Sequence, residues 1–276
     1  MFERFSRSWE LVKASAAVLR SDKELLVFPV LSGIAALLVA ATFLVPAFAM
    51  KLFSGDAGIG TAIVGFLFYL CQYFVIFFFN AALVAAAMIR LEGGDPTVGD
   101  GLRAARERIV PILGYAAIAA TVGMLLQALR NKDNNFLVRL AGSALGVAWT
   151  LASFLVVPVL VQQNVGPIDA IKRSAELLKR TWGENAIGNV GIGMVFGLAM
   201  FLLIAVGVLM AIVAAQVSVA LAVTVGVFVA LAAVTLAIVQ SALAGIYSAA
   251  LYRYATVGEA PAGFAGTGLQ TAFAPR

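Results

Sequence analysis

Three aspartates between the apolar segments of this chain carry the side chains best suited to chemistry: Asp95, Asp100 and Asp169. Carboxylates that converge can hold a metal ion and serve as general acid and base, as an enzyme acting on lipid headgroups would require. The chain has no histidine and one cysteine, Cys71, so a Cys/His metal site is not expected. The enzyme hypothesis therefore requires these three aspartates to meet in the fold.

Sequence motifs give that hypothesis little support. The chain contains no G-x-S-x-G elbow, no Walker-type loop and no H-E-x-x-H pair. Most acidic residues have a basic neighbour three or four positions away, as Glu176 has Lys172 and Lys179, which indicates ion pairs on solvated helix faces. We therefore predict a protein that is not an enzyme, with no catalytic residue, no metal site and no cofactor.

Neutral polar side chains inside the apolar segments form a second candidate set: Asn80, Gln127 and Gln240. They could line the path of a neutral or apolar solute in a permease or exporter. Such side chains more often hydrogen-bond between helices, at about 0.6 kcal/mol each. We find no ionisable residue at mid-depth in the apolar segments, which argues against transport coupled to ions or protons.

Basic residues on two amphipathic segments are the strongest candidates for a binding role. These are Arg103, Arg106 and Arg108 in one segment, and Lys172, Arg173, Lys179 and Arg180 in the other. Each basic residue near an anionic leaflet contributes about 1 kcal/mol of attraction. The predicted partners are anionic membrane lipids or a membrane protein. Nucleic acid is not expected, because the basic residues flank apolar segments. Topology alone explains the same residues equally well.

The elements that must position these residues are membrane-spanning helices. Hydrophobic residues make up 62% of the chain and charged residues 12%, and residues 186–252 contain no charged side chain. About 20 helical residues cross the bilayer core, so we predict an all-α protein with about six transmembrane helices. The predicted spans are 26–50, 59–89, 109–129, 137–161, 186–213 and 217–252. A third crossing within 186–252, which gives seven spans, stays open.

Charge predicts the orientation of these spans. Lys51, Arg130, Lys132 and Arg139 are the four basic residues on one side, and the other 15 of the 19 lie on the opposite side. Basic residues concentrate in cytoplasmic loops. Both termini are therefore predicted to be cytoplasmic.

The six spans are predicted to form three hairpins, each preceded by a cytoplasmic amphipathic helix. The repeat-like units are 1–95, 96–166 and 167–260 of a single transmembrane domain, followed by a flexible tail, 261–276. Each unit ends in Gly and Pro, which stop a helix. Chance convergence of interfacial helices remains an alternative to a true repeat. The predicted apolar faces of the first and third such helices are Phe5, Trp9, Val12, Ala16 and Leu19, and Ile168, Ile171, Ala175 and Leu178.

Three segments carry a resemblance to a known family: Phe5–Pro29, the Gly93–Arg103 run and Leu251–Thr256. Together they resemble a family of uncharacterised prokaryotic integral membrane proteins, known as a domain of unknown function. The resemblance implies a six-span protein of a prokaryotic cytoplasmic membrane. It implies no activity and no functional residue.

These observations favour a non-catalytic integral membrane protein that interacts with anionic lipids or a membrane partner, as an organiser or scaffold. A permease or exporter for a neutral or apolar solute is the first alternative. A lipid-modifying enzyme at the headgroup level is the second.

Overall fold

The computed structural model describes residues 2–49, 58–132, 136–182, 191–259, 261 and 264. These residues form helices and no strand, which confirms the all-α prediction. The helices are α1 (Phe2–Ser21), η1 (Lys23–Leu26), α2 (Val27–Ala49), α3 (Ile59–Leu91), α4 (Val98–Glu107), α5 (Ile109–Lys132), α6 (Phe136–Ser153), α7 (Val156–Gln162), α8 (Pro167–Trp182), α9 (Gly191–Val217) and α10 (Val219–Val257).

The long helices form three hairpins: α2 with α3, α5 with α6 and its continuation α7, and α9 with α10. The short helices α1, α4 and α8 precede them, as predicted. Within the described residues, six helical segments are long and apolar enough to cross a membrane. Among these residues, the uncharged region that begins at residue 186 folds as two helices, α9 and α10, with Ser218 between them. The Ser218 hydroxyl caps α10 by accepting a hydrogen bond from the Leu221 N–H.

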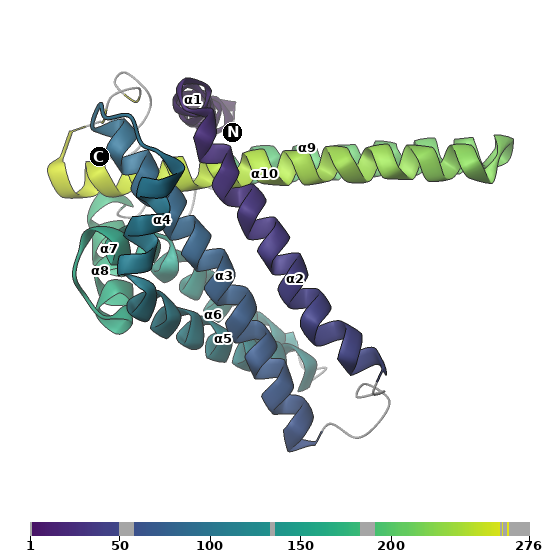
Figure 1. Ribbon diagram of the computed structural model, residues 1–276, viewed down its shortest axis with the longest axis horizontal. Coiled ribbons are helices and arrows are strands. Elements are labelled where there is room, and N and C mark those ends of the chain that lie inside the picture. The colour runs from purple at the N-terminus through teal and green to yellow at the C-terminus, as the bar shows by residue number, and fades with distance from the viewer. Residues whose placement is uncertain are drawn as a thin grey trace.

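One end of the molecule gathers the short helices together with the helix ends at Ser21, Leu91, Gln162 and Val257; we call it the basic end (Figure 1). From this end α2, α3, α5 and α6 run away side by side. The hairpin of α9 and α10 leaves in a different direction, so its tip stands apart from the other helices. We call residues 191–241 of this hairpin the arm.

The buried core lies next to the basic end. Residues 81–88 of α3 and 245–252 of α10 are buried throughout, and they pack with Phe28, Ile112 and Leu155. By contrast, none of residues 219–241 of α10 is fully buried. The core therefore joins the three hairpins at one end only.

Glycines allow the close approaches inside this core. A Cβ at Gly245 of α10 would lie 2.4 Å from Leu83 Cδ2, and one at Gly101 of α4 would lie 2.6 Å from the carbonyl oxygen of Ala82. Helices in lipid pack through small residues, because burial from water does not drive them together. Gly245 and Gly101 thus bring α10 and α4 against α3.

Glycines end two helices at the basic end, at or next to the Gly and Pro stops expected from the sequence. Gly93 adopts a left-handed conformation with φ 88°, and the Gly94 N–H donates to the Ile89 carbonyl at 2.9 Å, which closes α3 in a Schellman motif. Gly258, with φ 83°, ends α10 in the same region of backbone space. Pro167 opens α8, where its missing N–H costs nothing.

The fourth span is broken between Ser153 and Val156. Pro158 has no N–H to donate to the carbonyl four residues earlier, so the helix cannot continue unchanged. The Leu155 N–H donates instead to the buried hydroxyl of Ser174 at 2.9 Å. Ser174 belongs to α8, so this bond fastens α8 across the break.

The short helices bury a face that differs in part from the predicted one. On α8, Ala170, Ser174 and Leu178 are buried, whereas Ile168 is 60% exposed and Ala175 is also exposed. The small side chains of Ala170 and Ser174 let α8 approach the spans closely, which turns Ile168 and Ala175 outward. The predicted apolar face of α8 is therefore wrong for these two residues.

On α1, Val12 and Leu19 are buried as expected and Ala16 is half-buried. Phe5 and Trp9 lie outside the residues whose side chains are described. In the segment predicted as a flexible tail, Phe264 is fully buried in the core. Apart from Pro261 and Phe264, the segment 261–276 lies outside the described residues.

Candidate functional site

Polar side chains at the basic end connect helices that are far apart in sequence. Arg173 of α8 donates to the Gln163 side-chain carbonyl, and the Gln163 amide donates to the Tyr252 hydroxyl of α10 at 2.9 Å. Next to Gln163, the Asn164 side-chain carbonyl accepts from Arg108 Nη1 at 2.6 Å. The loop between α7 and α8 therefore ties α10, α8 and the start of α5 together.

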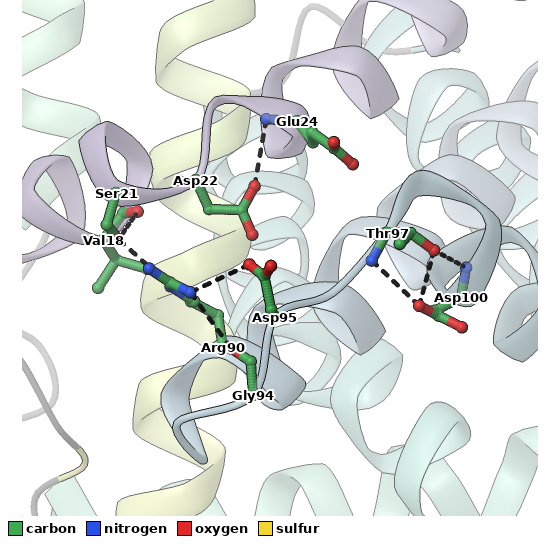
Figure 2. A network of polar contacts seen from close by, with 9 residues as sticks. All are labelled: Val18, Ser21, Asp22, Glu24, Arg90, Gly94, Asp95, Thr97 and Asp100. Carbon is green, nitrogen blue, oxygen red and sulfur yellow. Dashed lines mark hydrogen bonds and ion pairs between the residues drawn. The ribbon is translucent and has the colours of Figure 1, made fainter.

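A second set of contacts surrounds the end of α3. Arg253 of α10 pairs with Glu92 at 2.8 Å. Arg90 donates to the Asp95 carboxylate at 3.3 Å and to the Ser21 hydroxyl at 3.4 Å, which links α3 to α1 (Figure 2). The Arg253–Glu92 ion pair therefore joins the first and third hairpins at the basic end.

Asp22 is the most unusual acid in this set, because it is only 7% exposed. One carboxylate oxygen accepts from the Glu24 N–H at 3.2 Å, and the other, Oδ2, is buried with no hydrogen-bond partner among the described residues. Figure 2 shows Asp22 facing Asp95 and Arg90. Burial raises the pKa of Asp22 above its ordinary value, although the Glu24 N–H and Arg90 act in the opposite direction.

Asp100 serves as part of a helix cap. Thr97 and Asp100 form a capping box at the start of α4, and the hydrogen bonds from Thr97 lower the pKa of Asp100. Arg103 donates to the same carboxylate at 2.5 Å. The role of Asp100 is therefore explained by helix formation.

The predicted headgroup residues fall into three groups. Arg103, Arg108, Lys172 and Arg173 have protein partners: Asp100, Asn164, Asp169 and Gln163 respectively. Arg106 and Lys179 are exposed, and within the described residues neither has an ion pair or hydrogen bond. The side chain of Arg180 lies outside the described part.

The predicted intramembrane residues are not brought to one place. Gln127 accepts from the Tyr69 hydroxyl at 2.9 Å, whereas Asn80 lies beside Gly245, its Oδ1 3.6 Å from where a Cβ would be. Tyr69 and Asn80 are about 16 Å apart along α3. Gln240 is half-buried on α10. A single cavity lined by all three residues is thus not formed by these contacts.

The three aspartates of the enzyme hypothesis each have a local cation instead. Asp95 pairs with Arg90, Asp100 with Arg103, and Asp169 with Lys172 at 3.8 Å. Among the described residues, no three acidic, histidine or cysteine side chains are placed to hold a metal ion. A metal-binding cluster of Asp95, Asp100 and Asp169, which the enzyme alternative required, is therefore absent from the described residues.

Comparison with known proteins places the chain in a family without an assigned activity. The sequence model of the family of unknown function DUF6159 matches residues 58–264. The chain belongs to this family. The DUF6159 match contains α3 to α10 and Phe264, and it leaves α1 and α2 outside. No curated protein and no solved structure matches the chain.

Sequence reasoning missed the contacts that organise this end of the DUF6159 fold. Gln163 and Tyr252 are 89 positions apart, and Arg108 and Asn164 are 56 apart, so no local spacing could connect them. Asp22 had one usable signal: it lies directly before the short helical turn Lys23–Leu26, a position where aspartate commonly caps.

Proposed function

We propose that this integral membrane protein acts without catalysis, by binding anionic lipids at the cytoplasmic ends of its spans in a prokaryotic membrane. The proposal takes the basic end as cytoplasmic, which is supported by the 15 to 4 distribution of basic residues. It assigns the basic side chains of α4 and α8 to the lipid headgroups.

The observation that carries the proposal is how α8 is held. Ala170, Ser174 and Leu178 fix one face of α8 to the spans, while Lys172 and Lys179 lie exposed on the other side. Helix α4 repeats the arrangement, with Gly101 and Ala105 buried and Arg106 exposed. Cations that are positioned where the spans end face the headgroup layer, where each contributes about 1 kcal/mol of attraction to anionic lipid.

We propose neither the permease nor the headgroup enzyme. Gln127 and Asn80 are separated along α3, which removes the shared polar lining that a permease site would have needed. Asp95 and Asp169 are each engaged with a neighbouring cation, which accounts for them without chemistry.

Native mass spectrometry with an equimolar mixture of phosphatidylglycerol and phosphatidylcholine tests the proposal. We expect the wild type to retain phosphatidylglycerol preferentially, and the variant Arg106→Gln/Lys172→Gln/Lys179→Gln to lose most of that preference. The control, Glu107→Gln/Glu176→Gln, removes negative instead of positive charges from the same two helices. It should increase the preference for phosphatidylglycerol. Equal retention of the two lipids by the wild type would contradict the proposal.

A further inference from the structure

The cations at the basic end differ in the kind of partner they have. Arg90, Arg103, Lys172 and Arg253 are each paired with a carboxylate. Arg108 and Arg173 are bonded instead to the neutral side-chain carbonyls of Asn164 and Gln163. A carboxylate cancels the charge of an arginine, whereas an amide only holds its position.

These two arginines are brought to one short loop. Gln163 and Asn164 are consecutive, so their Cα atoms are about 3.8 Å apart. The orientation of the Gln163 amide is fixed as well, because its nitrogen donates to Tyr252 of α10 at 2.9 Å, and Tyr252 is only 7% exposed. Because Gln163 and Asn164 are neighbours in the chain, Arg108 and Arg173 are both anchored to the same short loop, which also contacts α10.

Within the described part of the chain, no direct ion pair balances the charge of Arg108 and Arg173. Glu107 precedes Arg108, and Asp169 and Glu176 lie on α8 with Arg173. Asp169 pairs with Lys172, and none of the three forms an ion pair with Arg108 or Arg173 within the described residues. Each guanidinium has five N–H groups, so donors remain after the single bond to an amide.

A phosphate group matches these donors. Guanidinium binds phosphate through paired hydrogen bonds in a fixed planar geometry, which ammonium cannot reproduce. We propose that Arg108 and Arg173, held by Gln163 and Asn164, form a binding site for the phosphate of one anionic lipid. The site rests on the proposed function and deepens it, because it adds a specific, saturable site to the general attraction of the basic helices.

Native mass spectrometry of the full chain, titrated with phosphatidylglycerol, tests the site. We expect one lipid to bind before the others in the wild type. Arg108→Lys and Arg173→Lys keep the charge but lose the planar fork, so each should weaken this first binding about tenfold or more. Arg253→Lys, on an arginine of α10 that is paired with Glu92, is the matched control and should leave it unchanged. The melting temperature of each variant is compared with that of the wild type, to check that the variant is folded.

Other outcomes distinguish a failure of the specific phosphate site from a failure of the proposed function. If the lysine variants bind the first lipid as the wild type does, the specific site is wrong, while an unchanged preference for phosphatidylglycerol over phosphatidylcholine keeps the general function. If that preference is itself absent, the general function fails. A parallel titration with inorganic phosphate distinguishes the source: tight binding of phosphate with no first lipid would overturn the lipid assignment.

Discussion

Helix α10 passes through two different environments along one continuous helix. Residues 245–252 are buried among α3 and the other helices of the core, whereas none of residues 219–241, which run beside α9 in the arm, is fully buried. Both stretches are apolar, so hydropathy does not separate them. Apolar composition therefore places a helix in the membrane. Small residues and hydrogen-bonded polar side chains decide which part of that helix packs against the rest of the protein.

The largest expected effect comes from filling the glycine where α10 crosses α3. Gly245→Leu forces a side chain into Leu83, since a Cβ alone would lie 2.4 Å from Leu83 Cδ2. We expect a loss of about 1–3 kcal/mol, the usual cost of overpacking, read as a lower melting temperature in detergent. Gly226→Leu is the control in the open stretch, where no atom lies within 4 Å of the new Cβ. Equal losses of stability for the two variants would contradict the difference between the two stretches of α10.

A buried hydrogen bond in the core should give the next effect. Ser174→Ala leaves the buried Leu155 N–H without its acceptor, and an unsatisfied buried donor costs about 1–3 kcal/mol. The melting temperature should fall, whereas Ser241→Ala, at an exposed position of α10, should leave it almost unchanged. An unaltered melting temperature for Ser174→Ala would mean that the break in the fourth span is not fastened by α8.

Asp22 should make the stability of the basic end depend on pH. Burial raises the folded-state pKa of Asp22 above its unfolded value, so the folded protein binds more protons in the range between the two values. Stability then falls as pH rises from the ordinary aspartate pKa through the raised one. Asp22→Asn, which removes the ionisable group, should flatten the melting temperature against pH over that range. Glu107→Gln is an exposed control, and an equally steep profile in Asp22→Asn would contradict the assignment.

The smallest effect is expected outside the core, between α3 and α5. Gln127→Leu removes the acceptor of the Tyr69 hydroxyl, and such bonds between transmembrane helices contribute about 0.6 kcal/mol on average. Tyr69→Phe should cost a similar amount, and the double variant no more than either single one. A loss as large as that of Ser174→Ala would mean that the two regions do not differ in how strongly they are held.

Much of the fold could be predicted from the sequence. Apolar length predicted the spans, and glycines placed before prolines predicted the helix ends near Gly94 and Gly258, because these signals act within a few residues. The divergence of the arm could not be predicted, since α9 and α10 are apolar on all sides and no periodicity marks a protein-facing stripe. The buried face of α8 was mispredicted for Ile168, because small residues such as Ala170 and Ser174 set the contact.

The candidate site could likewise be predicted only in part from the sequence. The basic residues of α4 and α8 stand out by charge alone, so they were found. Their partners Gln163, Asn164 and Tyr252 carry no charge, and they meet the arginines only in the folded chain. The sequence therefore indicated where anions could bind, but it did not show which arginines lack a carboxylate.

Quenching of tryptophan fluorescence by brominated phosphatidylcholine tests the contrast within α10 most directly. Trp9, Trp149 and Trp182 are first replaced by Phe, and a single tryptophan is then introduced by Phe228→Trp or by Tyr247→Trp; in the structure Phe228 is 68% exposed and Tyr247 is 8% exposed. We predict strong quenching for Phe228→Trp and little for Tyr247→Trp in lipid vesicles. Equal quenching at the two positions, or protection of the tryptophan at 228, would contradict a helix that is open to lipid along the arm and buried at the basic end.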